Sequence, residues 1–339
     1  HGLLALGAEA TAFAFPITMA MSFNRSLWSA TGRQIGRETR AYMNMGVGHS
    51  TVWAPVVDLA LDPRWGRNLE TAGEDPHLSA EYAVSFVRAL ERAPEDASHL
   101  QASACCKHFA GYAMDNTISA GVRHWRSEFD ANISLRDLAD SYLPAFEACV
   151  RRGQVSGLMC SYNSVNGVPM CANKWLLNDI ARKSWGFDGY VVSDCDAAED
   201  AFRLHEYKAS AAEVAADVLR AGTDIDCGAF VPFHAKRALD RSLIGMAHLD
   251  TALGRLMRLR LRLGHFDPPG ALASIPPSAI CSTEAQALAA SGAAQGAALL
   301  KNVGGALPLS TNATVAVVGW LPNSADDSGY YGPNKPCGG

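Results

Sequence analysis

The sequence predicts an α/β fold, a (β/α)8 barrel of the TIM type followed by the start of a second α/β domain. Short apolar runs alternate with helical patterns along most of the chain, an order that favours a parallel sheet. The runs read as strands buried on both faces, as barrel strands are. Polar side chains follow several of them, which is expected where barrel strands open into an active site.

Six apolar runs are the predicted strands, and a segment with helical spacing follows most of them. They cover residues 16–23, 51–59, 101–109, 156–162, 189–195 and 223–228. The helix after the third run is the clearest, because a Ser134-x-x-Asp137 capping box opens it. Its apolar residues recur at helical spacing, namely Leu135, Leu138, Tyr142, Leu143, Phe146 and Cys149. Six β/α units are therefore predicted.

The repeating pattern stops after a helix predicted over residues 248–264. Residues 267–283 contain prolines and a glycine that break regular structure, so we interpret them as a linker. Residues 284–339 then begin with an alanine-rich helix, followed by a turn and a strand predicted over 314–320. The predicted organisation is a barrel over 1–266, the linker, and an incomplete second domain over 284–339.

Composition and charge exclude some classes of partner. The chain has 339 residues, of which 48% are hydrophobic and 19% charged, enough to bury a large core. Its formal net charge is -5 and it has no long run of Lys or Arg, so neither nucleic acid nor an anionic membrane is expected to bind. No apolar stretch approaches the ~20 residues of a membrane helix, and the N-terminus lacks the features of a signal peptide.

The nine cysteines form no CxxC pair of the zinc-binding type, so no metal site is predicted, and most are expected to be buried thiols. Cys160 and Cys171 flank a loop with an Asn-Gly turn that can bring them within disulfide distance. Cys195 and Cys227, after neighbouring predicted strands, are a second candidate pair. Three sequons, at Asn24, Asn132 and Asn312, favour a secreted glycoprotein.

Polar residues cluster where five of the predicted strands end. They are Asp58, Asp62 and Arg67; Lys107 and His108; Tyr162 and Asn163; Asp194 and Asp196; and Asp224 with Asp226. Carboxylates, cations and hydrogen-bonding groups gathered in one pocket suit a polyhydroxylated ligand.

Five of these segments also resemble a known family. DPRWGRNLETAGEDP, ACCKHFAGY, GLMCSYNSVNGVPMCAN, GYVVSDCDA and RAGTDIDCG are similar to successive signatures of glycoside hydrolase family 3, most closely its β-xylosidase and α-L-arabinofuranosidase branch. The resemblance implies a retaining exo-glycosidase without cofactor that removes terminal β-D-xylosyl or α-L-arabinofuranosyl residues from plant cell-wall-type oligosaccharides or aryl glycosides.

The resemblance also implies that parts of the family's fold lie outside this chain. His1-Gly2 resembles the end of the family's first active-site loop, so the first barrel strand or strands are expected to be missing. In the family an α/β sandwich domain follows the barrel and supplies the general acid/base glutamate. No residue of this chain matches that glutamate.

The resemblance assigns Asp194 as the nucleophile, and the end of a buried strand would hold it rigidly in line with the sugar. The alternative role for Asp194 is a helix N-cap. For Asp196 and Asp200 a capping or solvent-exposed position is favoured over catalysis. Lys107 and His108 would bind sugar hydroxyls and offset the charge of the nucleophile. The alternative for His108 is a core histidine.

Three more residues are predicted to bind sugar. Arg67 matches a sugar-binding position, or else it bridges Glu70 or Glu74. Tyr162 and Met159 match positions that line the sugar site, although core packing is equally expected for Met159. For Trp65 stacking on a sugar and burial in the core are equally expected, and the carboxylates of Glu74 and Asp75 are expected to cap a helix.

Alternatives from other classes stay open. The chain could be a β-glucosidase of the same family, or a catalytically impaired sugar-binding relative because no acid/base is present. An unrelated barrel enzyme that holds a metal through Asp and His is the third reading, although no HxH or HExxH spacing occurs. The loop after the Lys-His strand lacks a histidine, which disfavours the family's N-acetylhexosaminide subgroup. The sequence leaves the oligomeric state open.

Overall fold

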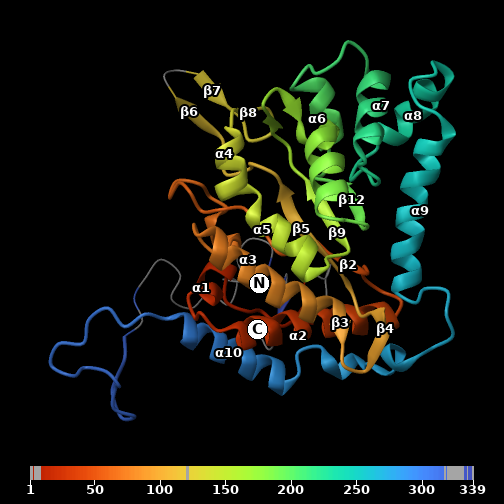
Figure 1. Ribbon diagram of the computed structural model, residues 1–339. Helices are drawn as coiled ribbons and strands as arrows, with labels where there is room; N and C mark the ends of the chain where they lie inside the picture. Colours follow the sequence, from red (N-terminus) through yellow and green to blue (C-terminus); the bar gives the residue numbers. More distant parts are fainter. Residues whose placement is uncertain are drawn as a thin grey trace.

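A computed structural model describes residue 3 and residues 9–119, 122–316, 318, 332–333 and 335–337. Its central feature is a parallel sheet in the order β12-β9-β5-β2, with helices packed outside it (Figure 1). The strands are β2 (Thr51–Val52), β5 (Ser103–Phe109), β9 (Gly157–Cys160) and β12 (Tyr190–Ser193). Single bridges join Val56 to Lys107 and Val192 to Ile225. Five of the six predicted strand segments therefore contribute to this sheet.

Helices precede, separate and follow the strands of the sheet. They are α1 (Pro16–Ala20), α2 (Arg25–Asn44), α3 (Pro76–Glu91), α4 (Leu135–Asp137), α5 (Pro144–Ala148), α6 (Ala197–Arg203), α7 (Ala211–Ala221), α8 (Phe230–Asp240), α9 (Met246–Arg262) and α10 (Thr283–Gly296). Wide π-type turns η2 (Leu138–Tyr142), η3 (Cys149–Gly153) and η5 (Trp175–Ser184), with 3-10 turns η1 (Asn68–Glu70), η4 (Met170–Ala172), η6 (Ala271–Ser274) and η7 (Pro277–Ala279), complete the helical segments.

Short strands lie outside the central sheet. They are β1 (Glu9–Ala10), β3 (Arg92–Ala93), β4 (Asp96–Leu100), β6 (Thr117–Ser119), β7 (Val122–His124), β8 (Asp130–Ala131), β10 (Ser164–Val165), β11 (Val168–Pro169) and β13 (Lys335–Pro336). β8 pairs with β10, which forms a hairpin with β11. β13 pairs with β1, so the described end of the chain returns to its beginning.

Local sequence signals explain where several helices begin. The Asp75 carboxylate accepts a hydrogen bond from Leu78 N at 2.6 Å, and Pro76 occupies the first position of α3, which confirms the predicted cap. Ser134 caps α4 by accepting from Asp137 N at 3.1 Å. In the predicted capping box the Asp137 carboxylate would accept from the Ser134 backbone N–H. It accepts instead from the Ser134 hydroxyl, at 2.8 Å.

Two predicted strands are wrong in the described residues. Residues 16–23 contain helix α1, because Pro16 fixes the helical φ at its first position and Met19 and Ala20 bury themselves against the core. Of the strand predicted over 314–320, residues 314–316 and 318 are described and are in no strand, and the rest lies outside the described residues. His1-Gly2 lies outside the described residues.

The alternation of side chains along the strands sets the direction of the functional groups. One face of the sheet carries Cys105, Met159, Tyr190 and Val192, which form a hydrophobic cluster with Leu259 of α9. The other face packs its side chains against α3 and α5. Because successive strand residues point to opposite faces, Asp194 follows Tyr190 and Val192 onto the α9 side, one layer above them.

A buried carboxylate connects the N-terminal ends of β5 and β9. One oxygen of Glu91 accepts hydrogen bonds from Ala104 N at 3.0 Å, Ser156 N at 2.9 Å and the Ser156 hydroxyl at 2.6 Å. Burial raises the pKa of Glu91 to about 7, although these donors oppose the rise. The protonated form is therefore favoured in the fold over a wide range of pH.

Glu91 should make the fold less stable as the pH rises. Below pH 4.5 the carboxyl is protonated in both states, whereas between pH 4.5 and about 7 the unfolded chain loses the proton and the folded chain keeps it. The resulting loss of unfolding free energy is on the order of 3 kcal/mol. Glu91→Gln should remove this part of the pH dependence while its amide oxygen still accepts. Urea unfolding of both proteins across that pH range checks this, and equal slopes would contradict it.

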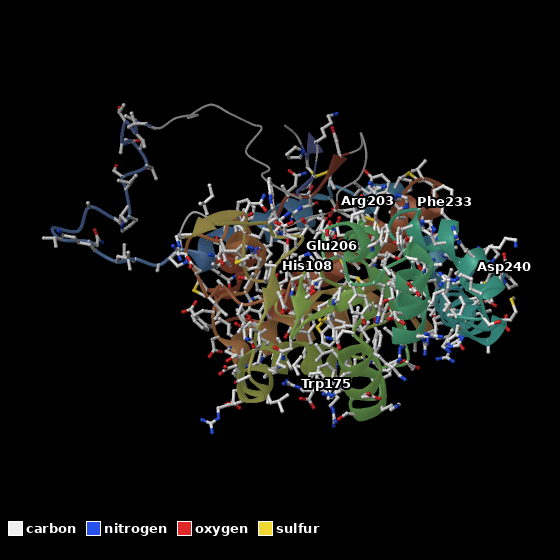
Figure 2. All side chains as sticks on the ribbon, turned by 90° about the horizontal axis from the view of Figure 1, so that it is seen from above. His108, Trp175, Arg203, Glu206, Phe233 and Asp240 are labelled. Carbon is white, nitrogen blue, oxygen red and sulfur yellow. A yellow bond between two sulfur atoms is a disulfide. The ribbon has the colours of Figure 1, made fainter. Side chains whose placement is uncertain are left out.

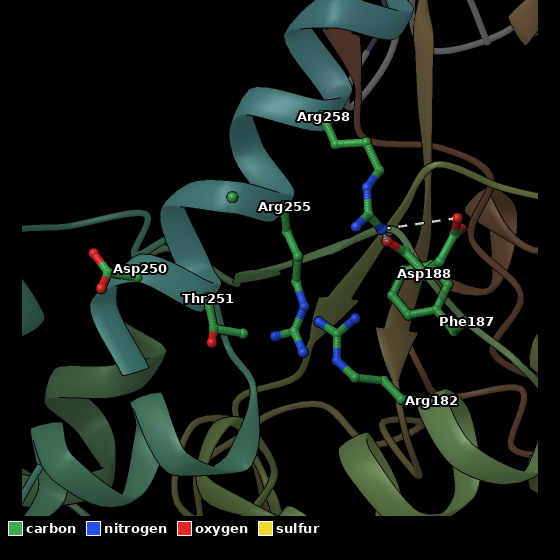
Figure 3. Close-up of a pocket in the computed structure, with 8 residues that line it drawn as sticks. Arg182, Phe187, Asp188, Asp250, Thr251, Arg255 and Arg258 are labelled. Atoms are coloured by element: carbon green, nitrogen blue, oxygen red, sulfur yellow. Dashed lines mark hydrogen bonds and ion pairs between the residues drawn. The ribbon is translucent and has the colours of Figure 1, made fainter. Parts of the chain in front are cut away.

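A second buried carboxylate, Asp224, holds the start of β12. It accepts from Val191 N at 2.9 Å, from Arg182 at 2.8 Å and from Arg255 at 2.7 Å. The two arginines face each other at a cavity of about 450 Å³ between α9 and the segment before β12 (Figure 3). This cavity and Asp194 lie at opposite ends of β12. The prediction that Asp224 lies in the active-site pocket is therefore wrong. Asp224 comes before Ile225, the residue that pairs with β12, and so lies toward the end of that strand away from Asp194.

Four disulfides are present, and Cys105 is the one free thiol among the nine cysteines. They join Cys160 to Cys171, Cys195 to Cys227, Cys106 to Cys149 and Cys281 to Cys337. The first two are the pairs that the sequence suggested. The expectation that most cysteines are free thiols is wrong, because the other two bridges join segments that only the fold brings together.

Candidate active site

Asp194 lies immediately after β12, at the C-terminal end of the sheet. Its backbone N–H donates to Cys160 O of the neighbouring β9 at 2.9 Å. Cys195 N donates to its Oδ1 at 2.8 Å. The side chain is 14% exposed, so the carboxylate is held by the sheet and by its own turn while one part still faces solvent. A carboxylate fixed in this way is suited to in-line attack on a bound substrate.

His108 lies between two carboxylates. Asp58 Oδ2 accepts from the His108 backbone N–H at 3.0 Å and from its ring Nδ1 at 2.8 Å. These two bonds turn Nε2 toward Asp194 Oδ2, which is 3.6 Å away. Seen from above, His108 lies in the middle of the molecule, whereas Trp175 and Asp240 lie at its edge (Figure 2).

Burial and nearby cations determine the charge of His108. Burial lowers its pKa well below 6.5, and Arg67 and Lys107 lower it further. Burial also raises the pKa of Asp58. The neutral imidazole donates from Nδ1 to Asp58, so its Nε2 is free to accept a hydrogen from a sugar hydroxyl. The His108 ring is thus buried as a core histidine would be, but it faces two carboxylates, and its role toward sugar stays a prediction.

Lys107 brings a buried ammonium to the same strand end. Its parallel bridge to Val56 fixes its backbone, and its charge interacts with the charges of Asp194 and Glu70. Burial lowers the pKa of Lys107 and Arg67 adds to this, whereas Glu70 and Asp194 raise it. The positive charge of Lys107 and the negative charge of Asp194 therefore attract each other at this strand end.

Arg67 forms a buried ion pair in the loop before η1. Its Nε and Nη2 donate to the two oxygens of Glu70 at 2.6 and 2.8 Å, and both side chains are 7% exposed. Burial disfavours the charged guanidinium, but Glu70 outweighs this and the pKa of Arg67 is raised. Its Cζ also lies 5.7 Å from the centre of the Tyr112 ring. The predicted bridge to Glu70 is thus present, and it holds Arg67 beside Lys107.

Tyr162 is a further residue in contact with Asp194. Burial raises its pKa, and the charge of Asp194 and a hydrogen bond to it raise the pKa further. The Arg126 guanidinium lies 5.3 Å from the centre of the Tyr162 ring and donates to the Tyr112 hydroxyl at 2.9 Å. The sequence reasoning missed Arg126, which lies in the loop after β7. A cation next to Trp125, in the loop after the Lys-His strand, was the signal available.

The remaining predicted residues have other surroundings. Met159 packs in the cluster below Asp194 with Cys105 and Tyr190, so its role toward sugar stays a prediction. Trp65 is buried, and its ring lies edge-on to Tyr112 at 6.2 Å. The exposed Asp196 precedes α6 without capping it. Asp200 is partly buried, and burial with Asp196 and Glu199 raises its pKa to about 6.

His205 connects α6, the helix that follows Asp194, to the loop that contains Tyr162. It follows α6, and its Nε2 lies 2.8 Å from Tyr162 O. A carbonyl only accepts, so Nε2 carries the proton and Nδ1 accepts from the Ser164 hydroxyl, 3.0 Å away. His205 is therefore a positioning residue for Tyr162, and sequence reasoning gave no signal for it.

Removing the bonds of His205 to Tyr162 and Ser164 should slow catalysis more than it weakens substrate binding. For His205→Ala in the full-length protein we expect kcat to fall by about ten- to a hundredfold with KM changed much less, because Tyr162 is displaced relative to Asp194. His205→Gln keeps a donor for the Tyr162 carbonyl and should recover much of the loss. Steady-state kinetics of the two variants check this, and equal losses in both would contradict the positioning role.

No group of three His, Cys, Asp or Glu side chains in the described parts of the chain is arranged to hold a metal ion. No helix there is long and apolar enough to cross a membrane.

The chain is similar to proteins of one family. Residues 1–259 match the family model described as glycosyl hydrolase family 3 N terminal domain. Among curated proteins, the chain is 42% identical to Beta-D-xylosidase 1 of Arabidopsis thaliana over 93% of its length. It is 40% identical to Beta-xylosidase/alpha-L-arabinofuranosidase 2 of Medicago sativa subsp. varia, again over 93%. The chain spans 40% and 41% of the length of these two relatives.

Solved structures agree in fold. A GH3 exo-β-xylosidase in complex with a xylobiose aziridine probe has a TM-score of 0.83 and 34% identity, over 92% of this chain and 41% of that one. A β-glucosidase from Listeria innocua in complex with glucose has a TM-score of 0.78 and 29% identity, over 89% and 40%. The predicted α/β barrel class is thereby confirmed.

Proposed function

The chain belongs to glycosyl hydrolase family 3, and from this membership we propose that it is the nucleophile-bearing barrel of a retaining exo-β-xylosidase. Asp194 is the nucleophile that forms the covalent glycosyl intermediate. Lys107, His108, Arg67, Arg126 and Tyr162 bind the hydroxyls of the sugar and hold its anomeric carbon at Asp194. Terminal β-D-xylosyl residues of plant cell-wall-type oligosaccharides are the substrates, with α-L-arabinofuranosyl residues as a second group.

The observation that supports this proposal best is the set of buried groups at one strand end. Asp194 contacts His108 and Tyr162 there, and the charge of Lys107 acts on the same carboxylate. A metal-dependent barrel of another family, the third reading of the sequence, is set aside by the family match. The xylosidase names of the relatives favour xylose, whereas the β-glucosidase structures keep glucose as the second candidate.

Nitrophenyl glycosides test the substrate. The full-length gene product should cleave the β-D-xyloside with the highest kcat/KM, the α-L-arabinofuranoside less well and the β-D-glucoside least. A preference for the glucoside would move the protein to the β-glucosidase reading, and sugar binding without cleavage of any of the three would make it an impaired relative.

We also propose that the protein is secreted. Eight of its nine cysteines are paired, and disulfides in this number are typical of oxidising compartments. Immunoblotting of medium and cell fractions from the source tissue would test this, and protein confined to the cytosol would overturn it.

A further inference from the structure

The three sequons have different surroundings in the structure, and Asn24 is the most constrained. Its side-chain Oδ1 accepts from Ser26 N at 3.0 Å and from Leu27 N at 3.2 Å, which makes it the N-cap of α2. Its Nδ2 donates to Gln295 Oε1 of α10 at 2.8 Å. Both ends of this carboxamide are therefore in use within the fold.

A glycan on Asn24 would conflict with these contacts. The sugar would be bonded to Nδ2, the atom that faces Gln295, and would enter the place where α10 lies against the start of the chain. α10 packs closely there, because a Cβ at Gly292 would come within 2.7 Å of the Met19 sulfur and one at Gly296 within 2.4 Å of Thr18 O. The packed face of α10 is therefore closed to an oligosaccharide, and a sugar on the exposed side would have to displace Gln295 from its bond to Asn24.

Asn132 has the opposite surroundings. It is exposed, directly after β8, and its side chain has no hydrogen-bond partner among the described residues. The backbone beside it is fixed, because Asn166 Oδ1 accepts from Ile133 N and Asn166 Nδ2 donates to Ile133 O, both at 2.9 Å. Asn166 N also donates to Ala131 O at 3.1 Å. The fold thus presents a free carboxamide to solvent on a rigid backbone.

We propose that Asn132 carries an N-linked glycan and that Asn24 does not. The proposal rests on the secretion proposed above. In the reaction, Asn132 Nδ2 attacks the anomeric carbon of a lipid-linked oligosaccharide, a nitrogen–carbon bond forms, the bond from that carbon to the lipid pyrophosphate breaks, and an amide proton passes to a base of the transferase. Asn312 lies beyond α10 and is outside the proposal.

The place of Asn132 puts the glycan at the rim of the active site. β8 pairs with β10, with Asp130 opposite Ser164, and Ser164 is two residues after Tyr162. The glycan would therefore cover the outer side of the loop that contains Tyr162, and its attachment would change no residue of the active site.

Site-specific mass spectrometry tests the proposal. The full-length protein is secreted from a eukaryotic host behind a supplied leader and deglycosylated with peptide N-glycosidase in heavy-oxygen water, which converts each formerly glycosylated asparagine to labelled aspartate. We expect label at Asn132 and none at Asn24. An unlabelled Asn132 or a labelled Asn24 would overturn the proposal.

Matched variants separate the glycan from the fold. Asn132→Gln should lower the intact mass by one glycan without loss of glycosidase activity, and Ser134→Thr should keep the glycan because the sequon survives. Asn24→Gln should leave the mass of the glycans unchanged and lower the melting temperature, because the cap of α2 is lost. Xyloside cleavage is measured on the same samples, so an inactive protein with the expected glycan would count against the proposed function alone.

Discussion

Asp194→Ala in the full-length protein should lose glycoside cleavage, with kcat reduced by roughly 10⁵-fold or more, the scale seen when a covalent nucleophile is removed. The reason is geometric as well as chemical. β12 and the bond from Asp194 N to Cys160 O hold this carboxylate at the strand end, whereas the nearby Asp58 and Glu70 carboxylates are buried and bonded to His108 and Arg67. Circular dichroism should be unchanged, since the backbone bond survives the substitution.

Two controls make this result specific to attack. Exogenous azide should enter the space that the carboxylate leaves and partly restore cleavage of an activated xyloside, giving the xylosyl azide of inverted configuration. Asp196→Ala removes an exposed carboxylate two residues away and should retain activity. Full activity in Asp194→Ala, or equal loss in both variants, would rule out the assignment of the nucleophile.

Arg67→Met should have the largest effect on stability. It leaves Glu70 as a buried charge without its bidentate partner, which typically costs about 3–5 kcal/mol of unfolding free energy. In the double variant Arg67→Met with Glu70→Leu no charge is stranded, so most of that stability should return. Urea unfolding of the wild type, the single variant and the double variant measures both steps.

The activity of the double variant decides between the two roles of Arg67. If Arg67 only bridges Glu70, the double variant recovers activity together with stability. We expect instead that its kcat/KM for a xyloside stays about ten- to a hundredfold low, because a charged hydrogen bond to a sugar hydroxyl is worth about 1.5–3 kcal/mol. Recovery to the wild-type value would remove Arg67 from the sugar site.

The sequence predicts well what depends on local order. Asp194 and the Lys107-His108 pair could be located because each follows or ends an apolar run, and the carboxyl ends of parallel strands share one edge of a sheet. The same rule placed Asp224 wrongly, because this residue comes before Ile225, where its segment pairs with β12, and not after it. The run over 16–23 was misread because apolar content alone does not distinguish a short helix from a strand.

What the sequence could not show depends on contacts between distant segments. The contacts of Arg126 with Tyr112 and Tyr162 follow from no sequence spacing, although its place beside Trp125 marked it as a cation in a loop after the Lys-His strand. The pairing of Cys106 with Cys149 requires β5 and η3 to be neighbours, whereas the pairing of Cys160 with Cys171 requires only a short loop. His205 acts through a carbonyl 43 residues away in sequence, and no residue type signals such a bond.

The two buried carboxylates beneath the sheet have a consequence for how this scaffold can change. Glu91 and Asp224 tie β5, β9 and β12 together at the ends of the strands away from Asp194. Randomising the loops that carry Arg126 and Tyr162, with the buried Arg67–Glu70 pair kept, therefore leaves these attachments untouched. A library directed at those loops should keep a high proportion of folded members and allow selection for new sugars, whereas the same number of changes around Glu91 should yield mostly insoluble chains.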